Sequence, residues 1–212
     1  MAVLARSDRG AEQLGRTVRI DPADLVAAYS PVTTAAKGGT MTIAELCAAA
    51  ISNSDNSAAN LLLRTVGGPA GVTNYLRSLG DPDTRLDHYE PELNRMPPHD
   101  PHDTTTPAAM ADLLARLVRD PVLSAPAKAR LFDWMRRAET GLARIRAGVP
   151  AGWTVGDKTG TTNSAGNDVA ILWPRSGAPL VLAVYFAEVQ AADPQRDAAI
   201  ADVARDVVQR LA

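Results

Sequence analysis

The pattern of apolar residues changes sharply at Pro150, and this change constrains the fold of the 212-residue chain most strongly. Before it, apolar residues recur mainly at helical spacing. After it, residues 153–158, 168–173 and 180–189 have the composition of strands, and the turns between them are rich in Gly, Ser and Asn. The final segment returns to helical spacing, with one apolar face formed by Ile200, Val203, Val207 and Leu211. Helices followed by strands and a closing helix predict an α+β fold.

Six helices are expected before Pro150, at residues 43–51, 57–66, 70–79, 107–119, 127–138 and 141–147. Thr42 and Glu45 form a capping box at the start of the first, and Pro107 occupies the first position of the fourth. Residues 1–6 are also helix-compatible but have no N-cap before them, which suggests that the chain begins inside an element.

A long loop at residues 81–106 interrupts these helices, and six prolines punctuate the stretch from Pro82 to Pro107. A loop of this length in a compact domain is usually functional or disordered. It contains all three histidines, His88, His99 and His102, beside several aspartates. Their spacing matches no established metal-ligand pattern, so we expect no metal.

Composition excludes several classes of function. The net charge is −2 with scattered basic residues, which gives no footprint for nucleic acid or an anionic membrane. No apolar run has the length of a membrane-spanning helix, and residues 1–10 have none of the features of a signal peptide. The single cysteine, Cys47, is either a small core residue or half of a disulfide whose partner lies outside this chain.

Two short motifs could carry chemistry. Ser54-Asp55-Asn56 falls in a break between two helices, where side chains can be presented to a cleft, although all three residue types are also common N-caps. Lys158-Thr159-Gly160-Thr161 lies at the end of a predicted strand, and its ammonium and hydroxyl groups suit an anionic carboxylate lying along the strand edge. The alternative for this second motif is a polar strand end before a turn.

These motifs and a third, Glu90-Pro91-Glu92-Leu93-Asn94, resemble those of class A β-lactamases, as do Tyr29-Ser30-Pro31-Val32 and residues 41–63. The resemblance covers essentially the whole chain. It implies a mostly helical domain at residues 1–148, with an omega-like loop at 85–103, and an antiparallel sheet flanked by helices at 149–212. The first helix and first strands of the family pattern are missing from this chain.

The resemblance also implies a role for each site residue in serine acyl-enzyme hydrolysis of penicillins and cephalosporins, with resistance as the outcome. Glu90 matches the base that activates the deacylating water, and Asn94 helps to hold that water. Ser54 and Lys158 match the pair that passes a proton to the lactam nitrogen. The substrate-binding residues would be Tyr29, Asn56, Thr159, Gly160 and Thr161. No cofactor or metal is implied, and the complete protein would be a monomer that is secreted or periplasmic.

The nucleophile motif Ser-x-x-Lys is absent, because Thr34, Ala125 and Val155 precede the three lysines by three positions. We therefore expect the chain as written to be inactive and, with an unpaired apolar edge on the strand at 180–189, unstable or insoluble by itself. Three hypotheses remain: a β-lactamase known here from a fragment, a protein that binds β-lactams or peptidoglycan stems without turnover, and a D,D-peptidase relative. Glu90 with Asn94 argues against the third.

The resemblance adds two further expectations. Cys47 matches a cysteine that related enzymes can pair with one on the nucleophile helix. His88 replaces an arginine that, in many relatives, pairs with the aspartate matching Asp103 at the neck of the loop. We expect His88 and Asp103 to form a weaker, titratable pair, whose loss disorders the loop as pH rises.

Overall fold

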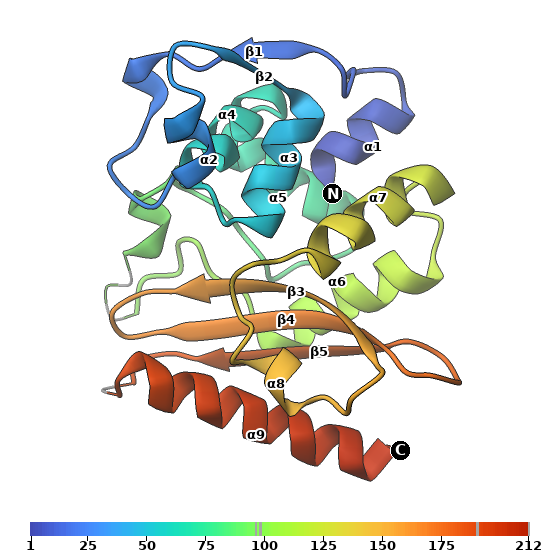
Figure 1. Ribbon diagram of the computed structural model, residues 1–212. Coiled ribbons are helices and arrows are strands. Elements are labelled where there is room, and N and C mark those ends of the chain that lie inside the picture. Colours follow the sequence, from blue (N-terminus) through green and yellow to red (C-terminus); the bar gives the residue numbers. More distant parts are fainter. Residues whose placement is uncertain (96, 98, 190, 212) are drawn as a thin grey trace.

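The computed structural model describes residues 1–95, 97, 99–189 and 191–211. The first two thirds of the chain are mainly helical (Figure 1). The helices of this part are α1 (Ala2–Asp8), α2 (Pro31–Ala35), α3 (Ile43–Ser52), α4 (Asn56–Thr65), α5 (Gly68–Ser78), α6 (Pro107–Arg119), α7 (Ala125–Arg136) and α8 (Ile145–Gly148). Two short antiparallel strands, β1 (Thr17–Arg19) and β2 (Thr40–Thr42), lie at its outer edge, and single 3-10 turns occupy Pro22–Asp24 and Glu92–Asn94.

The remaining third forms an antiparallel sheet with the strand order β3-β4-β5. Its strands are β3 (Thr154–Thr161), β4 (Gly166–Trp173) and β5 (Leu180–Phe186), and the closing helix is α9 (Asp193–Leu211). Helices α6 and α7 pack against one face of the sheet, while α8 and α9 cover the other (Figure 1). The result is three layers, with the sheet in the middle.

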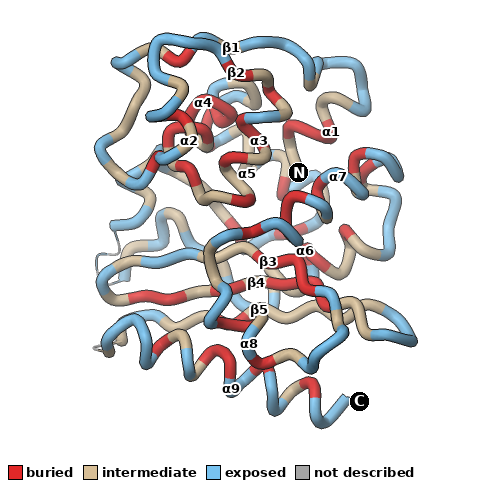
Figure 2. The backbone as a smooth tube through the Cα atoms, viewed as in Figure 1, coloured by how far each residue is buried: buried red, intermediate tan, exposed pale blue. Residues whose placement is uncertain are grey.

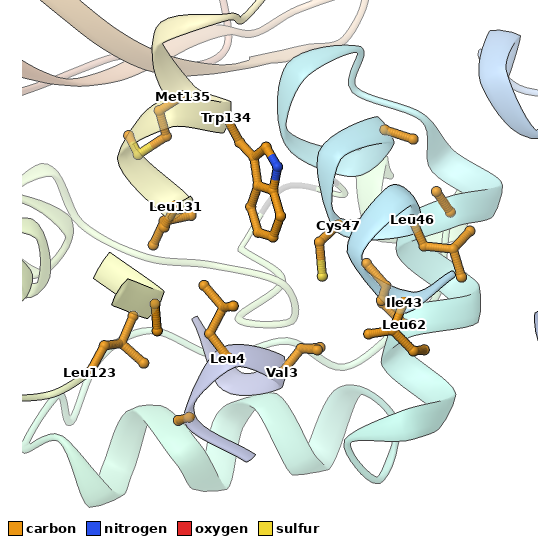
Figure 3. Packing of buried hydrophobic residues seen from close by; sticks show 14 of the residues in the cluster. Val3, Leu4, Ile43, Leu46, Cys47, Leu62, Leu123, Leu131, Trp134 and Met135 are labelled. Carbon is orange, nitrogen blue, oxygen red and sulfur yellow. The ribbon is translucent and has the colours of Figure 1, made fainter. Parts of the chain in front are cut away.

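Alternating side chains of β4 divide the core between the two faces of the sheet. Ile171 belongs to the cluster shared with the helical part, whereas its neighbour Leu172 belongs to the cluster under α9. The larger cluster gathers around Leu4, Cys47 and Trp134, which point toward one another between α1, α3 and α7 (Figure 3). Buried segments occur both within the helical part, in α3 and α4, and along the sheet (Figure 2). Cys47 is buried as a free thiol, and burial raises its pKa to about 11.

The predicted α+β class is confirmed, but some element boundaries differ. Strand β3 continues past Lys158 to Thr161, so the whole lysine motif forms the last four residues of the strand. Helix α8 begins at Ile145 and not at residue 141, because Gly141 has a left-handed φ of +83°. Three-residue strands such as β1 and β2 are too short to show a period, and sequence analysis missed them. None of the described helices is long and apolar enough to cross a membrane.

Candidate active site

Ser54 lies at the turn between α3 and α4, where the chain reverses direction. Its φ of +56° is unusual for a residue with a side chain, and such backbone conformations concentrate at functional sites. The Nζ atom of Lys158, on β3, donates a hydrogen bond of 2.7 Å to the Oγ atom of Ser54. Two residues that are 104 positions apart in sequence therefore meet in a direct contact.

Asp55 has a structural role that explains why the neighbouring residues are in place. Its buried carboxylate caps α4 through the N–H of Ala58 and also accepts hydrogen bonds from the N–H groups of Val32 and Thr33 and from the Thr33 hydroxyl. These bonds fix the start of α2 against α4. The N–H of Asn56 then donates to the carbonyl of Tyr29 over 3.0 Å, which places the exposed Tyr29 ring beside the cleft.

Glu90 is held at the cleft by Asn60 of α4. The side chain of Asn60 accepts a hydrogen bond from the N–H of Glu90 over 2.8 Å and donates to its carbonyl over 2.9 Å. Asn94 donates from Nδ2 to the Glu90 carboxylate over 2.5 Å. Burial raises the pKa of Glu90, although the Asn94 hydrogen bond and the charge of Lys158 oppose the shift.

Strand β3 presents the lysine motif along one edge of the sheet. Burial lowers the pKa of Lys158 to about 8, although the charge of Glu90 opposes this shift. Thr159 donates through its hydroxyl to Thr140 over 2.9 Å. Arg144 donates from its guanidinium to the Thr161 hydroxyl over 2.8 Å, so the hydroxyls of the motif are fixed by the segment before α8.

All nine residues predicted for the site line one cavity of about 710 Å³, a volume typical of small-molecule sites. The lining includes acidic Glu90 together with Lys158 and the hydroxyls of β3. The arrangement brings together a carboxylate base, an amide, a lysine in contact with a hydroxyl, and a polar strand edge that suits an anion. Such a set can activate a water and stabilise a negatively charged ligand.

Sequence analysis missed three residues that shape this cavity. Asn60 clamps the backbone of Glu90, Thr140 contacts Thr159, and Arg144 contacts Thr161. Arg144 is only 6% exposed, and its guanidinium also donates to the carbonyls of Gly160 and Asn167. Nothing in the local sequence distinguishes Arg144 from the nearby arginines, because its partners come from strands that are distant in sequence.

Two of the loop histidines, His88 and His102, contact a carboxylate. The ring of His88 lies 2.5 Å from Asp103 and that of His102 lies 2.5 Å from Asp100, while the two rings pack edge to face. The expected His88–Asp103 pair is therefore present at the neck of the loop. Within the described residues, no three His, Cys, Asp or Glu side chains are grouped so that they could hold a metal ion.

Comparisons with known proteins identify the family of the chain. A model described as the beta-lactamase enzyme family matches residues 1–211. β-Lactamase FAR-1 of Nocardia farcinica is 50% identical over 88% of this chain and 60% of its own length. The carbapenem-hydrolyzing β-lactamase KPC of Klebsiella oxytoca is 46% identical over 99% of this chain and 72% of its own.

Solved structures show the same likeness. The last common ancestor of Gram-negative bacteria (GNCA4) class A β-lactamase superposes with a TM-score of 0.97 at 54% identity, over 100% of this chain and 80% of that one. A β-lactamase from Xanthomonas campestris gives a TM-score of 0.97 at 41% identity, over 100% of this chain and 79% of its own. The chain therefore spans between three fifths and four fifths of the length of these relatives.

Proposed function

The chain belongs to the class A β-lactamase family, and we propose that its cleft binds β-lactam antibiotics and takes part in their hydrolysis. The observation that carries this proposal is the meeting of Lys158 and Ser54 across one cavity from Glu90 and Asn94. Glu90, Lys158 and Ser54 supply the proton-transfer groups of an acyl-transfer reaction, and Asn94 fixes the Glu90 carboxylate. Because the 212 residues contain no Ser-x-x-Lys, the attacking serine is not among them.

In the proposed reaction, Glu90 removes a proton from the water that hydrolyses the acyl-enzyme. Burial moves the pKa of Glu90 toward neutral pH, and a general base is most effective when its pKa lies near the working pH. Asn94 fixes the carboxylate through its 2.5 Å hydrogen bond and offers its remaining polar groups to the water. The two hydrogen bonds with Asn60 hold the backbone of Glu90, which fixes the position of the base in the cleft.

Lys158 and Ser54 would deliver the proton to the departing lactam nitrogen. The 2.7 Å contact lets the lysine donate to the Ser54 hydroxyl, which then donates onward to the nitrogen. The lowered pKa of Lys158, about 8, makes its proton easier to give up than that of an exposed lysine. The positive charge of protonated Lys158 also attracts the carboxylate that β-lactams carry.

The strand edge would bind that carboxylate. Thr159 and Thr161 supply hydroxyls, and the N–H of Thr161 is the donor that we propose for the developing oxyanion. Gly160 between them leaves the backbone accessible. Asn56 would hold the acylamide of the substrate, and the exposed Tyr29 ring would form the wall of the cleft. We further propose that the working protein is a monomer outside the cytoplasm, and that it uses no metal or cofactor.

A second candidate is supported by the missing motif: a protein with this cleft but without a nucleophile would bind β-lactams and release them unchanged. Intact mass distinguishes the two. The native protein from its source is exposed to a slowly hydrolysed penicillin, and its mass is compared with the 22.4 kDa of this chain. A larger mass with a penicilloyl adduct supports hydrolysis. A mass of 22.4 kDa without adduct, together with saturable binding, supports the binding protein.

The role of Glu90 is tested in the same experiment. Glu90→Gln should lengthen the lifetime of the adduct by about 100-fold or more, since a general base contributes about this much. Glu92→Gln is the matched control, because Glu92 is an exposed carboxylate two positions away with no role in the proposal. Equal lifetimes in the two variants would contradict the assignment of Glu90, and neither adduct nor binding would contradict both functions.

A further inference from the structure

Two aspartates lie together, fully buried, behind the strand that carries the lysine motif. In the β3–β4 register, Asp157 opposes Ala170 and Thr159 opposes Asp168, so the two carboxyl groups are diagonal neighbours on one face. Both aspartates have 0% exposure. A Cβ atom built on Gly141 would lie 2.7 Å from Oδ2 of Asp157 and 3.8 Å from Oδ2 of Asp168. The two groups therefore flank one small space that water does not reach.

The hydrogen bonds around this pair are incomplete. Asp157 accepts from the guanidinium of Arg146 at Oδ1, and Asp168 accepts from the N–H of Ile145 at Oδ2 over 3.1 Å. The other oxygen of each carboxyl, Oδ2 of Asp157 and Oδ1 of Asp168, has no hydrogen-bond partner within the described part of the chain. A buried ionised carboxylate with one oxygen unsatisfied is costly. A proton removes that cost.

Charge balance singles out Asp168 as the group that holds the proton. The charged groups that act on the pair come from β3 and from the segment around α8: Lys158, Arg144 and Arg146. Arg146 is paired with Asp157 and Arg144 with Asp197. Arg196 pairs with Asp193, and Lys158 contacts Ser54. Asp168 is therefore left without an ion-pair partner among the described residues.

We propose that the two aspartates hold one proton at neutral pH, on Asp168, and that this uncharged carboxyl positions residues 140–145 against β3. Two carboxylates so close together in a dry site cannot both ionise without a large penalty. Burial, followed by the charge of Asp157, raises the pKa of Asp168 to about 8, while the Ile145 N–H and the charge of Arg144 act in the opposite direction. Burial also raises the pKa of Asp157, against its pair with Arg146.

The consequence reaches the cleft through the segment that Asp168 holds. This segment carries Thr140, which contacts Thr159, and Arg144, which contacts Thr161. If Asp168 were charged, a second buried negative charge would lie directly behind the hydroxyls that we assign to the ligand carboxylate. The effect on ligand binding rests on the proposed function, whereas the protonation of Asp168 does not depend on it.

Asp168→Asn is the first test, because the amide keeps the shape of a protonated carboxyl but does not titrate. In the unfolded chain an aspartate has a pKa near 3.8, whereas in the folded protein the pKa of Asp168 is about 8. The folded state therefore binds more protons in this window, and wild-type stability falls as pH rises through it. The melting temperature of the variant, relative to wild type, should rise between those pH values and level off above them.

Asp112→Asn is the matched control, because Asp112 is an exposed partner of Arg116 on α6 and its loss should give a flat difference over this window. A flat difference for Asp168→Asn as well would overturn the proposal. A second measurement needs no variant: carbon NMR of wild-type protein labelled at the aspartate carboxyls. One buried aspartate should remain protonated at neutral pH and titrate near 8. If every aspartate carboxyl is ionised at neutral pH, the proposal is wrong, whether or not the protein binds a β-lactam.

Discussion

At the scale of single residues, His88 is expected to make the stability of the long loop depend on pH. Asp103 accepts hydrogen bonds from the N–H groups of Asp87 and His88 and contacts the His88 ring over 2.5 Å. This contact raises the pKa of His88 above its ordinary 6.5. Protonated His88 therefore stabilises the loop fully below about pH 6.5, and this contribution is lost as pH rises through the raised pKa.

We accordingly expect proteolysis within residues 88–103 to become faster as pH rises from mildly acidic to mildly alkaline values. His88→Arg should remove the dependence, because arginine stays charged throughout this range. His99→Asn is the matched control, since His99 lies in the same loop with a φ of +65° that asparagine tolerates. The cleavage rate is read by mass spectrometry at each pH. A wild-type rate that does not change with pH would contradict the role of His88.

Sequence analysis named the side chains proposed for the site but not the residues that hold them in place. Glu90 and Asn94 could be predicted from their motif, whereas the clamp by Asn60 depends on a contact between residues 30 positions apart. Arg144 has the same character, because its partners lie on β3 and β4. Buried polar contacts between distant segments leave no periodic pattern, and so they become visible only in the folded chain.

At the scale of elements, α8 fits against α9 only because it ends in a glycine. A Cβ atom on Gly148 would overlap the backbone carbonyl of Ala201 and lie 2.8 Å from Cβ of Ala204. Neither backbone nor a Cβ atom can move aside as the end of a long side chain can. This close approach keeps α8 and the segment that carries Arg144 next to the sheet.

Gly148→Ala should therefore lower the free energy of unfolding by about 1–3 kcal/mol, the usual cost of overpacking a core. Gly15→Ala is the control, because nothing lies within 4 Å of the added atom there and no positive φ is required. Urea denaturation of both variants measures the difference. A Gly148→Ala midpoint equal to that of the control would show that α8 and α9 can separate at little cost.

Long elements were predictable and short ones were not. Helix α6 has the predicted bounds, since Thr106 caps it and Pro107 starts it. Strand β3 was expected to end at Lys158, yet pairing with β4 continues to Thr161. Tertiary pairing thus overrides local propensity at the residues that line the cleft.

At the scale of the whole molecule, strand β5 forms an apolar edge of the sheet. Within the described residues β5 pairs with β4 alone, and its side chains are mainly apolar on both faces. An apolar hollow of about 320 Å³ follows this edge, lined by residues that include Leu180, Leu182 and Val207. Unpaired backbone groups on an apolar edge strand are a template for pairing with another chain.

The 212-residue chain is therefore expected to self-associate through β5. Sedimentation equilibrium should give a mass that rises above 22.4 kDa with concentration, and amide exchange should show β5 gaining protection over the same range while β3 does not. Leu142→Ser should leave the association unchanged. Leu142 is an exposed apolar side chain that lines the cleft together with residues of β3, and β3 is the opposite edge strand of the sheet from β5. A constant monomer mass, or association that Leu142→Ser abolishes, would rule out the β5 edge as the contact.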